Sequence, residues 1–154
     1  MVALAAVHIT EEAVAGFRIF FNTEWFAGNE NCPVGRTKGL LVDQIGLFLL
    51  LAGLAITGAL VEARWLLVAV GIITADLVQH AVFSIAKGKY TPGVATSALY
   101  LLYVAYFFGR EELRSLVHLD WAWLAMAIGV AFIAVNYLVS GTIVRLGRCG
   151  PAGA

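Results

Sequence analysis

Three long runs without a charged residue constrain this chain more than any other feature of its sequence. They cover residues 45–61, 90–109 and 121–144, which are 17, 20 and 24 residues long. About 20 apolar residues of helix cross a hydrocarbon core of roughly 30 Å, so each run approaches the length of a transmembrane helix. The chain is 61% hydrophobic and 13% charged, whereas soluble domains are about 25% charged. We therefore expect a bilayer as its solvent.

Two further segments have a suitable length but contain polar residues. Residues 65–86 include Asp76, Gln79 and His80, and residues 2–26 include several charges. We predict an all-α fold, an integral membrane bundle of four to five transmembrane helices, whose first segment either spans or lies at the bundle mouth. The second helix should begin near Leu40, and Pro92 should lie in the first turn of the fourth. Residues 1–146 are expected to form a single helical membrane domain, with residues 147–154 as a flexible C-terminal tail.

The charges of the loops predict an orientation in a bacterial inner (plasma) membrane. One side carries six basic residues and the other carries three: Arg36, Lys38, Lys87, Lys89, Arg145 and Arg148 against Arg64, Arg110 and Arg114. The positive-inside rule makes the first side, with the C-terminus, cytoplasmic. Cys32 and Cys149 fall on that side and should be reduced, incidental thiols. The formal net charge is zero, so nucleic acid is not an expected partner.

Polar residues recur at helical spacing inside the apolar segments. His8 shares a helix face with Glu11 and Glu12, and that face continues to Arg18, because positions three and four apart are neighbours. Asp76, Gln79 and His80 repeat this spacing in the third segment. Asn136 and Tyr100 add polar groups from the last two segments. Ionisable groups in a bilayer are costly and face one another, so we expect these side chains to meet in one buried site.

Several interpretations of such a site remain open. The first is a polar network that holds the helices together. The second is acid–base catalysis by perturbed imidazoles and carboxylates. The third is a divalent metal bound by His8, Glu12 and His80, with Asp76 nearby, as a mixed nitrogen and oxygen set. A proton-coupled carrier is a fourth interpretation, although a bundle this small would need to form a homo-oligomer.

The sequence HITEE at residues 8–12 resembles the naming motif of the HXXEE family, small bacterial membrane proteins of unknown function. The stretches 20–26 (FFNTEWF), 76–83 (DLVQHAVF) and 89–101 (KYTPGVATSALYL) are also similar to that family. The resemblance implies that His8, Glu11, Glu12 and His80 form one functional set, and it implies no reaction. We interpret the turn at Tyr90, Pro92 and Gly93 as structural. Two roles are open for Thr96, a hydrogen bond to backbone or a place in the site, and we favour the bond to backbone.

The leading hypothesis is an enzyme that acts on a lipophilic small molecule, isoprenoid- or lipid-like, which enters from the bilayer. Glu11 or Glu12 would be the general acid or base, and His8 and His80 would shuttle a proton or bind a divalent metal. Isomerisation, cyclisation or hydrolysis would suit such a site. The substrate would be oriented by polar side chains from the neighbouring segments: Gln79, Asp76, Asn136, Tyr100 and Arg18. The alternative is a proton- or ion-coupled carrier or a structural subunit of a membrane complex.

Overall fold

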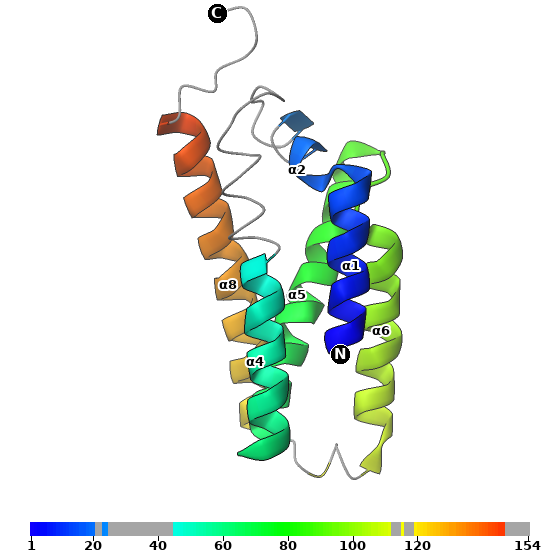
Figure 1. Cartoon of the computed structure of the whole chain (residues 1–154), viewed down its shortest axis with the longest axis vertical. Helices are drawn as coiled ribbons and strands as arrows, with labels where there is room; N and C mark the ends of the chain where they lie inside the picture. The colour runs from blue at the N-terminus through cyan, green and yellow to red at the C-terminus, as the bar shows by residue number, and fades with distance from the viewer. Residues whose placement is uncertain (21–22, 25–44, 112–114, 116–118, 147–154) are drawn as a thin grey trace, which may run out of the picture.

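A computed structural model describes residues 1–20, 23–24, 45–111, 115 and 119–146 of the chain. Helices and turns, without strands, make up these described residues, which confirms the all-α class. The long helices lie side by side in a bundle, with connecting turns at alternate ends (Figure 1). The helices are α1 (Val2–Ala15), α2 (Phe17–Phe20), α4 (Leu47–Leu60), α5 (Arg64–Lys87), α6 (Val94–Gly109) and α8 (Leu119–Leu146).

Helix α5 is the centre of the bundle and contacts α4, α6 and α8. All seven residues from Leu67 to Ile73 are buried, which is typical of a helix that is hydrophobic on every side. In the most apolar stretch of α5, 61% of the residues are buried, whereas in the most apolar stretch of α8 only 11% are buried. Helix α8 therefore presents an apolar surface outward, while α5 supplies the core.

Two of these helices are long and apolar enough to cross a membrane, namely Arg64–Lys87 and the stretch Trp121–Val139 of α8. Helices α4 and α6 are apolar but shorter. The sequence-based bounds of the third and fifth segments agree with α5 and α8 to within two residues. Residues 40–44, where the second segment was expected to start, and the tail at 147–154 lie outside the described residues.

Small residues bring α5 and α8 close together. A Cβ atom built on Gly71 would lie 2.1 Å from the backbone oxygen of Ala125, and one built on Gly129 would lie 2.3 Å from the oxygen of Gly71. Neither position has room for a side chain. Close backbone approach through glycine and alanine is characteristic of helix pairs in membranes.

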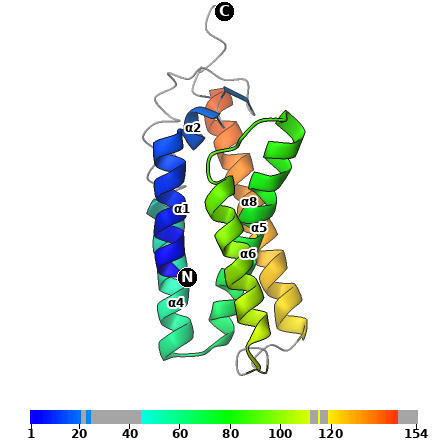
Figure 2. The ribbon, with the colours of Figure 1, turned by 90° about the vertical axis from the view of Figure 1, so that its right-hand side faces the viewer.

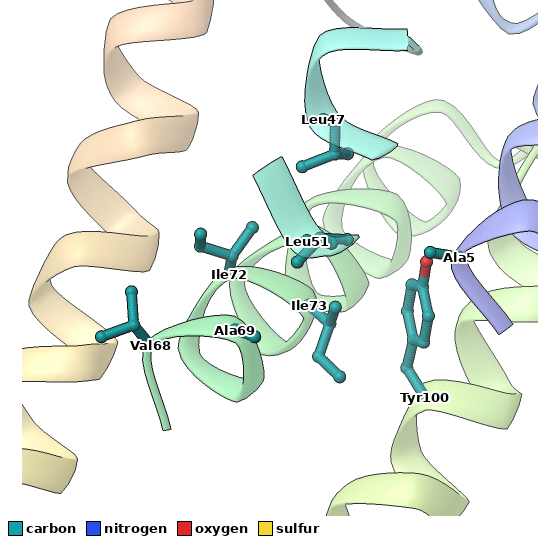
Figure 3. Close-up of a cluster of buried hydrophobic side chains, with 8 residues drawn as sticks. All are labelled: Ala5, Leu47, Leu51, Val68, Ala69, Ile72, Ile73 and Tyr100. Atoms are coloured by element: carbon teal, nitrogen blue, oxygen red, sulfur yellow. The ribbon is translucent and has the colours of Figure 1, made fainter. Parts of the chain in front are cut away.

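A cluster of apolar side chains joins four helices below the polar site. Figure 3 shows Ala5 of α1, Leu47 and Leu51 of α4, and Tyr100 of α6 around the same face of α5. Leu51 and Tyr100 are each 1% exposed. This cluster holds α1 beside α4 and α6, next to the stretch of α1 that carries its polar residues.

The first segment is shorter than expected, because Gly16 ends α1. Gly16 adopts a left-handed conformation with φ of 76°, and its N–H bonds to the carbonyl oxygen of Glu12, which is a common way to terminate a helix. The prediction of one helix over residues 2–26 was therefore wrong. Helix α1 begins part-way along the bundle and ends near the α5–α6 turn (Figure 2). Its 14 residues span about 21 Å.

The α5–α6 turn also differs from the sequence-based expectation. Helix α6 begins at Val94, two residues after Pro92, so Pro92 is not in its first turn. Gly93 separates them in a left-handed conformation with φ of 96°. A helix cannot continue through that conformation, so α6 can start only after Gly93.

Candidate functional site

Four buried ionisable side chains meet where α1 faces α5. His8 and Glu12 lie four residues apart on α1, and Asp76 and His80 lie four residues apart on α5. The two histidines are 0% exposed, Glu12 is 5% and Asp76 is 6% exposed. Each helix thus contributes one imidazole and one carboxylate from one face. We refer to these four residues as the histidine–carboxylate cluster.

Imidazole nitrogens and carboxylate oxygens alternate around this cluster. His8 Nε2 lies 3.0 Å from Asp76 Oδ2 and 3.7 Å from Glu12 Oε1. His80 Nε2 lies 3.2 Å from Glu12 Oε1 and 3.7 Å from Asp76 Oδ1. The rings of His8 and His80 meet edge to face with centroids 5.0 Å apart. Both Nε2 atoms therefore point into the same small volume.

These atoms are close, but they are not aligned for hydrogen bonds with one another. Among the described atoms, His8 Nε2, His80 Nε2 and Asp76 Oδ2 are buried without a partner in hydrogen-bond geometry. Buried polar atoms in native proteins almost always have a partner. The cluster consequently presents nitrogen lone pairs and carboxylate oxygens that the described protein atoms do not satisfy.

Glu11 faces away from the cluster and binds the start of α6. Its carboxylate accepts hydrogen bonds from the backbone N–H groups of Gly93 (3.0 Å) and Thr96 (2.8 Å). It also accepts from the hydroxyl groups of Tyr90 and Thr96. An anion is favourable there because the first N–H groups of a helix have no intrahelical partner.

The hydrogen bonds at Glu11 change the titration of both partners. Burial favours the neutral form of Glu11, but the bonds from Thr96, Tyr90 and Gly93 outweigh burial and lower its pKa to about 2. The contact with the Glu11 carboxylate raises the pKa of Tyr90 to about 12. Glu11 is therefore an ionised acceptor at neutral pH, and Tyr90 is a neutral donor.

Thr96 connects Glu11 to the cluster. Its hydroxyl group donates to Glu11 Oε2 and lies 2.9 Å from His8 Nδ1. A hydroxyl has one hydrogen to donate, and a charged acceptor is preferred. The Thr96 oxygen therefore accepts from Nδ1–H of His8, which leaves Nε2 of that ring with its lone pair exposed to the cluster. The Thr96 hydroxyl also lies 3.3 Å from the Gly93 carbonyl oxygen, which agrees with the expected hydrogen bond to backbone, and its contacts with Glu11 and His8 place it in the site as well.

Gly93 closes the cluster from the side of the α5–α6 turn. A Cβ atom at this position would lie 2.5 Å from Cε1 and 2.9 Å from Nε2 of His80, and 3.0 Å from Cε1 of His8. The Tyr90–Gly93 turn thus contacts both imidazoles and Glu11. We interpreted this turn as structural from the sequence; it is also a wall of the candidate site.

A cavity of about 30 Å³ adjoins the two carboxylates of the cluster. Such a volume can hold a water molecule. Gln79 and Asn136, which were predicted from the sequence, both line it. The cavity also has lining residues that the sequence did not indicate, because nothing in their spacing separates them from ordinary core residues: Phe17, Leu47, Phe132, Ile133 and Tyr137.

The other two predicted substrate-binding residues are placed differently. Tyr100 belongs to the apolar cluster of Figure 3, and its ring lies 5.0 Å from the ring of His8. Tyr100 does not line the 30 Å³ cavity. The side chain of Arg18 lies outside the described residues, as do Cys32 and Cys149.

Comparison with known families identifies a family that matches most of the chain. The family described as "protein of unknown function with HXXEE motif" matches residues 1–108, which include α1, α5 and the turn that carries Gly93. No curated protein and no solved structure is significantly similar to the chain. The chain belongs to the HXXEE family, and the motif letters correspond here to His8, Glu11 and Glu12.

Proposed function

We propose that this HXXEE-family chain is a membrane-embedded enzyme that acts on a lipophilic small molecule at the histidine–carboxylate cluster. The observation that carries the proposal is the meeting of two imidazoles and two carboxylates, all buried, beside a cavity. Groups of this kind in a low-dielectric site suit acid–base or metal-assisted chemistry. Isomerisation, cyclisation or hydrolysis of an isoprenoid- or lipid-like substrate are the reactions we favour.

Exposed apolar side chains support a bilayer location. The most apolar stretch of α8 has a mean hydropathy of 2.0 with only 11% of its residues buried. Trp123, Leu138 and Val130 on that helix are 59–70% exposed. Soluble monomers rarely expose continuous apolar surface on this scale. We propose that α4, α5, α6 and α8 span the membrane, that α1 packs at the mouth near the α5–α6 turn, and that the C-terminus is cytoplasmic.

The distribution of polar groups favours an enzyme over a carrier. The cluster, Gln79 and Asn136 lie toward the half of the bundle that contains the α5–α6 turn. Toward the opposite end, α5, α6 and α8 pack through the apolar residues Leu67, Val70, Phe107 and Ala125. A carrier needs polar groups that lead to both faces, whereas a dead-ended site suits a reaction. A carrier and a structural subunit remain the alternatives that the experiment must separate.

The lining of the cavity supports the proposed substrate class. Phe17, Phe132 and Ile133 provide apolar surface, and Gln79 and Asn136 provide amide groups. Ligand sites for lipophilic molecules combine such apolar walls with a few polar groups that fix orientation. The cavity at about 30 Å³ is far smaller than a lipid, so the substrate must separate helices that line it when it enters from the bilayer.

The test compares membrane lipids of cells that produce the protein. Cells expressing wild type, Glu12→Gln or Asp76→Asn at equal levels would be profiled by untargeted lipid mass spectrometry. Glu62→Gln is the control, because Glu62 pairs with the half-buried Arg64 at the far end of α5, away from the cluster. We expect a lipid species that changes with wild type and with Glu62→Gln, and that returns to the empty-vector level with both cluster variants.

Two results would contradict the enzyme proposal. Identical lipid profiles for wild type and both cluster variants, with all proteins folded in the membrane, would exclude a lipid substrate. Proton or ion flux into proteoliposomes that depends on Glu12 would identify a carrier. The isosteric substitutions keep side-chain volume, and size-exclusion chromatography of each purified variant shows whether it is folded.

A further inference from the structure

We propose that the histidine–carboxylate cluster binds one divalent transition-metal ion through His8 Nε2, His80 Nε2 and the carboxylates of Glu12 and Asp76. This site coincides with that of the proposed function, but metal binding requires no substrate and can be tested alone. Two imidazoles and two carboxylates form a donor set that suits zinc, manganese or ferrous iron.

The spacing of the donor atoms fits a single ion. The four distances from imidazole nitrogen to carboxylate oxygen lie between 3.0 and 3.7 Å. In a tetrahedral site with bonds of about 2.0–2.1 Å, neighbouring ligand atoms are separated by about 3.3 Å. One donor atom each from His8, Asp76 and His80 lies within 4.8 Å of the other two. The limit of 4.8 Å is wider than a tetrahedral site allows, so the side chains must rotate inward to hold the ion.

Hydrogen bonding within the cluster does not account for its geometry. His8 Nε2 and Asp76 Oδ2 are only 3.0 Å apart, yet neither atom meets hydrogen-bond geometry with any described partner. His80 Nε2 is likewise buried without a hydrogen-bond partner among the described atoms. A metal site that is described without its ion shows this pattern: buried ligand atoms that lie close together and lack hydrogen-bond partners.

Charge gives an independent argument. Two carboxylates are taken out of water at Glu12 and Asp76, which are 5% and 6% exposed. Their ion pairs within the cluster are with the two imidazoles. An uncompensated buried carboxylate is strongly unfavourable. One divalent cation would balance both charges while the imidazoles remain neutral, as metal ligands must be.

The contact from Glu11 through Thr96 orients His8 for this role. The Thr96 oxygen accepts from Nδ1–H of His8 at 2.9 Å while its hydroxyl hydrogen is donated to Glu11. Metal-binding histidines commonly donate their second ring N–H in this way, which fixes the tautomer and the direction of the ring. Thr96 and Glu11 are therefore positioning residues, and Glu12 is the ligand of the glutamate pair.

The cavity beside Glu12 and Asp76 leaves room for a ligand in addition to protein side chains, so water would be a fifth ligand of the ion or would replace one of the two carboxylates. Catalytic zinc sites leave a coordination position for water or substrate, whereas structural sites are fully occupied by protein ligands. The cavity of about 30 Å³ between these carboxylates, Gln79 and Asn136 has room for one water on the ion. A bound ion would lower the pKa of that water and make it a nucleophile or base.

The experiment measures metal in the full-length protein, purified in detergent without chelators. Elemental mass spectrometry would give the metal-to-protein ratio, and the stripped protein would be titrated with Co²⁺ while its visible d–d absorption is recorded. We expect about one ion per chain in wild type and at least a tenfold weaker Co²⁺ affinity in His8→Ala, His80→Ala, Glu12→Gln and Asp76→Asn. His118→Ala removes the third histidine of the chain as the matched control and should bind Co²⁺ like wild type.

A pair of variants tests the positioning role of Thr96. Thr96→Val removes the hydroxyl at nearly constant volume and should weaken Co²⁺ binding by about 10–100-fold. Thr96→Ser keeps the hydroxyl and should restore affinity and the wild-type spectrum. A merely structural role would lower the thermal midpoint in Thr96→Val without changing the Co²⁺ spectrum or affinity.

Folded wild type that binds neither Co²⁺ nor Zn²⁺ would overturn the metal proposal. So would a Co²⁺ spectrum unchanged in both His8→Ala and His80→Ala, or one lost in His118→Ala alone. The two proposals fail separately. Stoichiometric metal without any lipid change would support the metal site and contradict the enzyme proposal. A Glu12-dependent lipid change in metal-free protein would support the enzyme and contradict the metal site.

Discussion

The two adjacent glutamates of the HITEE motif have different surroundings. Glu12 lies in the histidine–carboxylate cluster, 3.2 Å from His80 Nε2. Glu11 receives four hydrogen bonds from Tyr90, Gly93 and Thr96 at the start of α6. Consecutive residues of a helix point about 100° apart, so a single pair of identical residues can address two neighbouring helices. The motif is therefore a junction of three helices as well as a set of reactive groups.

Glu11 gives a prediction for the pH dependence of stability. Its pKa falls from 4.5 to about 2 in the folded protein, so its stabilising contribution is complete above pH 4.5 and is lost as the pH falls toward 2. Replacing a charged hydrogen-bond acceptor costs about 2 kcal/mol, which we expect for Glu11→Gln at pH 7. Thermal midpoints in detergent should show a gap between wild type and Glu11→Gln that narrows from pH 5 to pH 3.

The exposed Glu62 provides the control for this measurement. Glu62→Gln should leave the midpoint nearly unchanged at pH 7, because exposed ion pairs contribute at most about 1 kcal/mol. A gap between wild type and Glu11→Gln that stays constant over the whole pH range would show that the Glu11 contacts do not depend on its charge.

Alanine substitutions at Gly93 and Gly88 test whether Gly93 contacts the imidazoles of the site. Both have positive φ, 96° and 61°, so alanine is strained at either position by about 1–2 kcal/mol. At Gly93 an added Cβ would also meet His80 at 2.5 Å, whereas nothing lies within 4 Å at Gly88. We expect Gly93→Ala to lower the thermal midpoint further than Gly88→Ala and to abolish the Co²⁺ spectrum. Equal effects of the two substitutions would exclude a contact between Gly93 and the imidazoles.

At the scale of helices, the sequence pattern predicts where the long helices lie more accurately than it predicts where helices begin and end. Helices α5 and α8 could be predicted because uncharged or nearly uncharged runs have few alternatives at that length. The end of α1 at Gly16 could not, because Val14, Phe17 and Ile19 continue the apolar pattern across it and one glycine is tolerated inside a helix. Likewise Pro92 indicated a helix start, but the left-handed Gly93 moved it by two residues.

The same contrast applies to the site. The pairs His8–Glu12 and Asp76–His80 could be predicted because residues four apart on a helix must share a face. The contact between Thr96 and His8 could not be predicted, because it depends on how closely the start of α6 approaches α1. His8 and Thr96 are 88 positions apart, and no local pattern carries information about that distance.

The crossing of α5 and α8 yields a prediction at the helix scale. Gly71→Ala would place a Cβ 2.1 Å from the Ala125 oxygen and force the helices apart, while Gly53→Ala on α4 meets nothing within 4 Å. We expect Gly71→Ala to destabilise the protein by about 1–3 kcal/mol and Gly53→Ala to be neutral or stabilising by up to about 1 kcal/mol. Thermal unfolding in detergent distinguishes them, and an unchanged midpoint in Gly71→Ala would contradict the close crossing.

For the whole molecule, two lysines at the α5–α6 end of the bundle contact the segment that follows α2. Lys89 pairs with Glu24 at 2.6 Å, and Lys87 Nζ donates to the backbone oxygen of Glu24. These contacts tie the segment after α2 to the α5–α6 turn. Both lysines belong to the end that the positive-inside rule places in the cytoplasm, so the proposed orientation puts the mouth of the site at the cytoplasmic surface.

Cysteine labelling tests this orientation in cells. Cys149 is expected in the cytoplasm, so a membrane-impermeant maleimide should label it in spheroplasts only after permeabilisation. Ser115→Cys in a cysteine-free background is the matched control from the opposite end of the bundle and should be labelled without permeabilisation. Labelling of Cys149 in intact spheroplasts would reverse the proposed orientation.

The distance along the chain between α1 and its partners has a consequence for biosynthesis. His8 is made early, but Thr96 follows it by 88 positions. A ribosome that adds about 5–20 residues per second needs roughly ten seconds to cover that interval. Until Asp76 and His80 have been made, His8 and Glu12 have only each other as native partners within the cluster, and water or a chaperone must solvate them. The order of translation therefore makes docking of α1 a late step, and the nascent chain will be most vulnerable to proteolysis before α6 emerges.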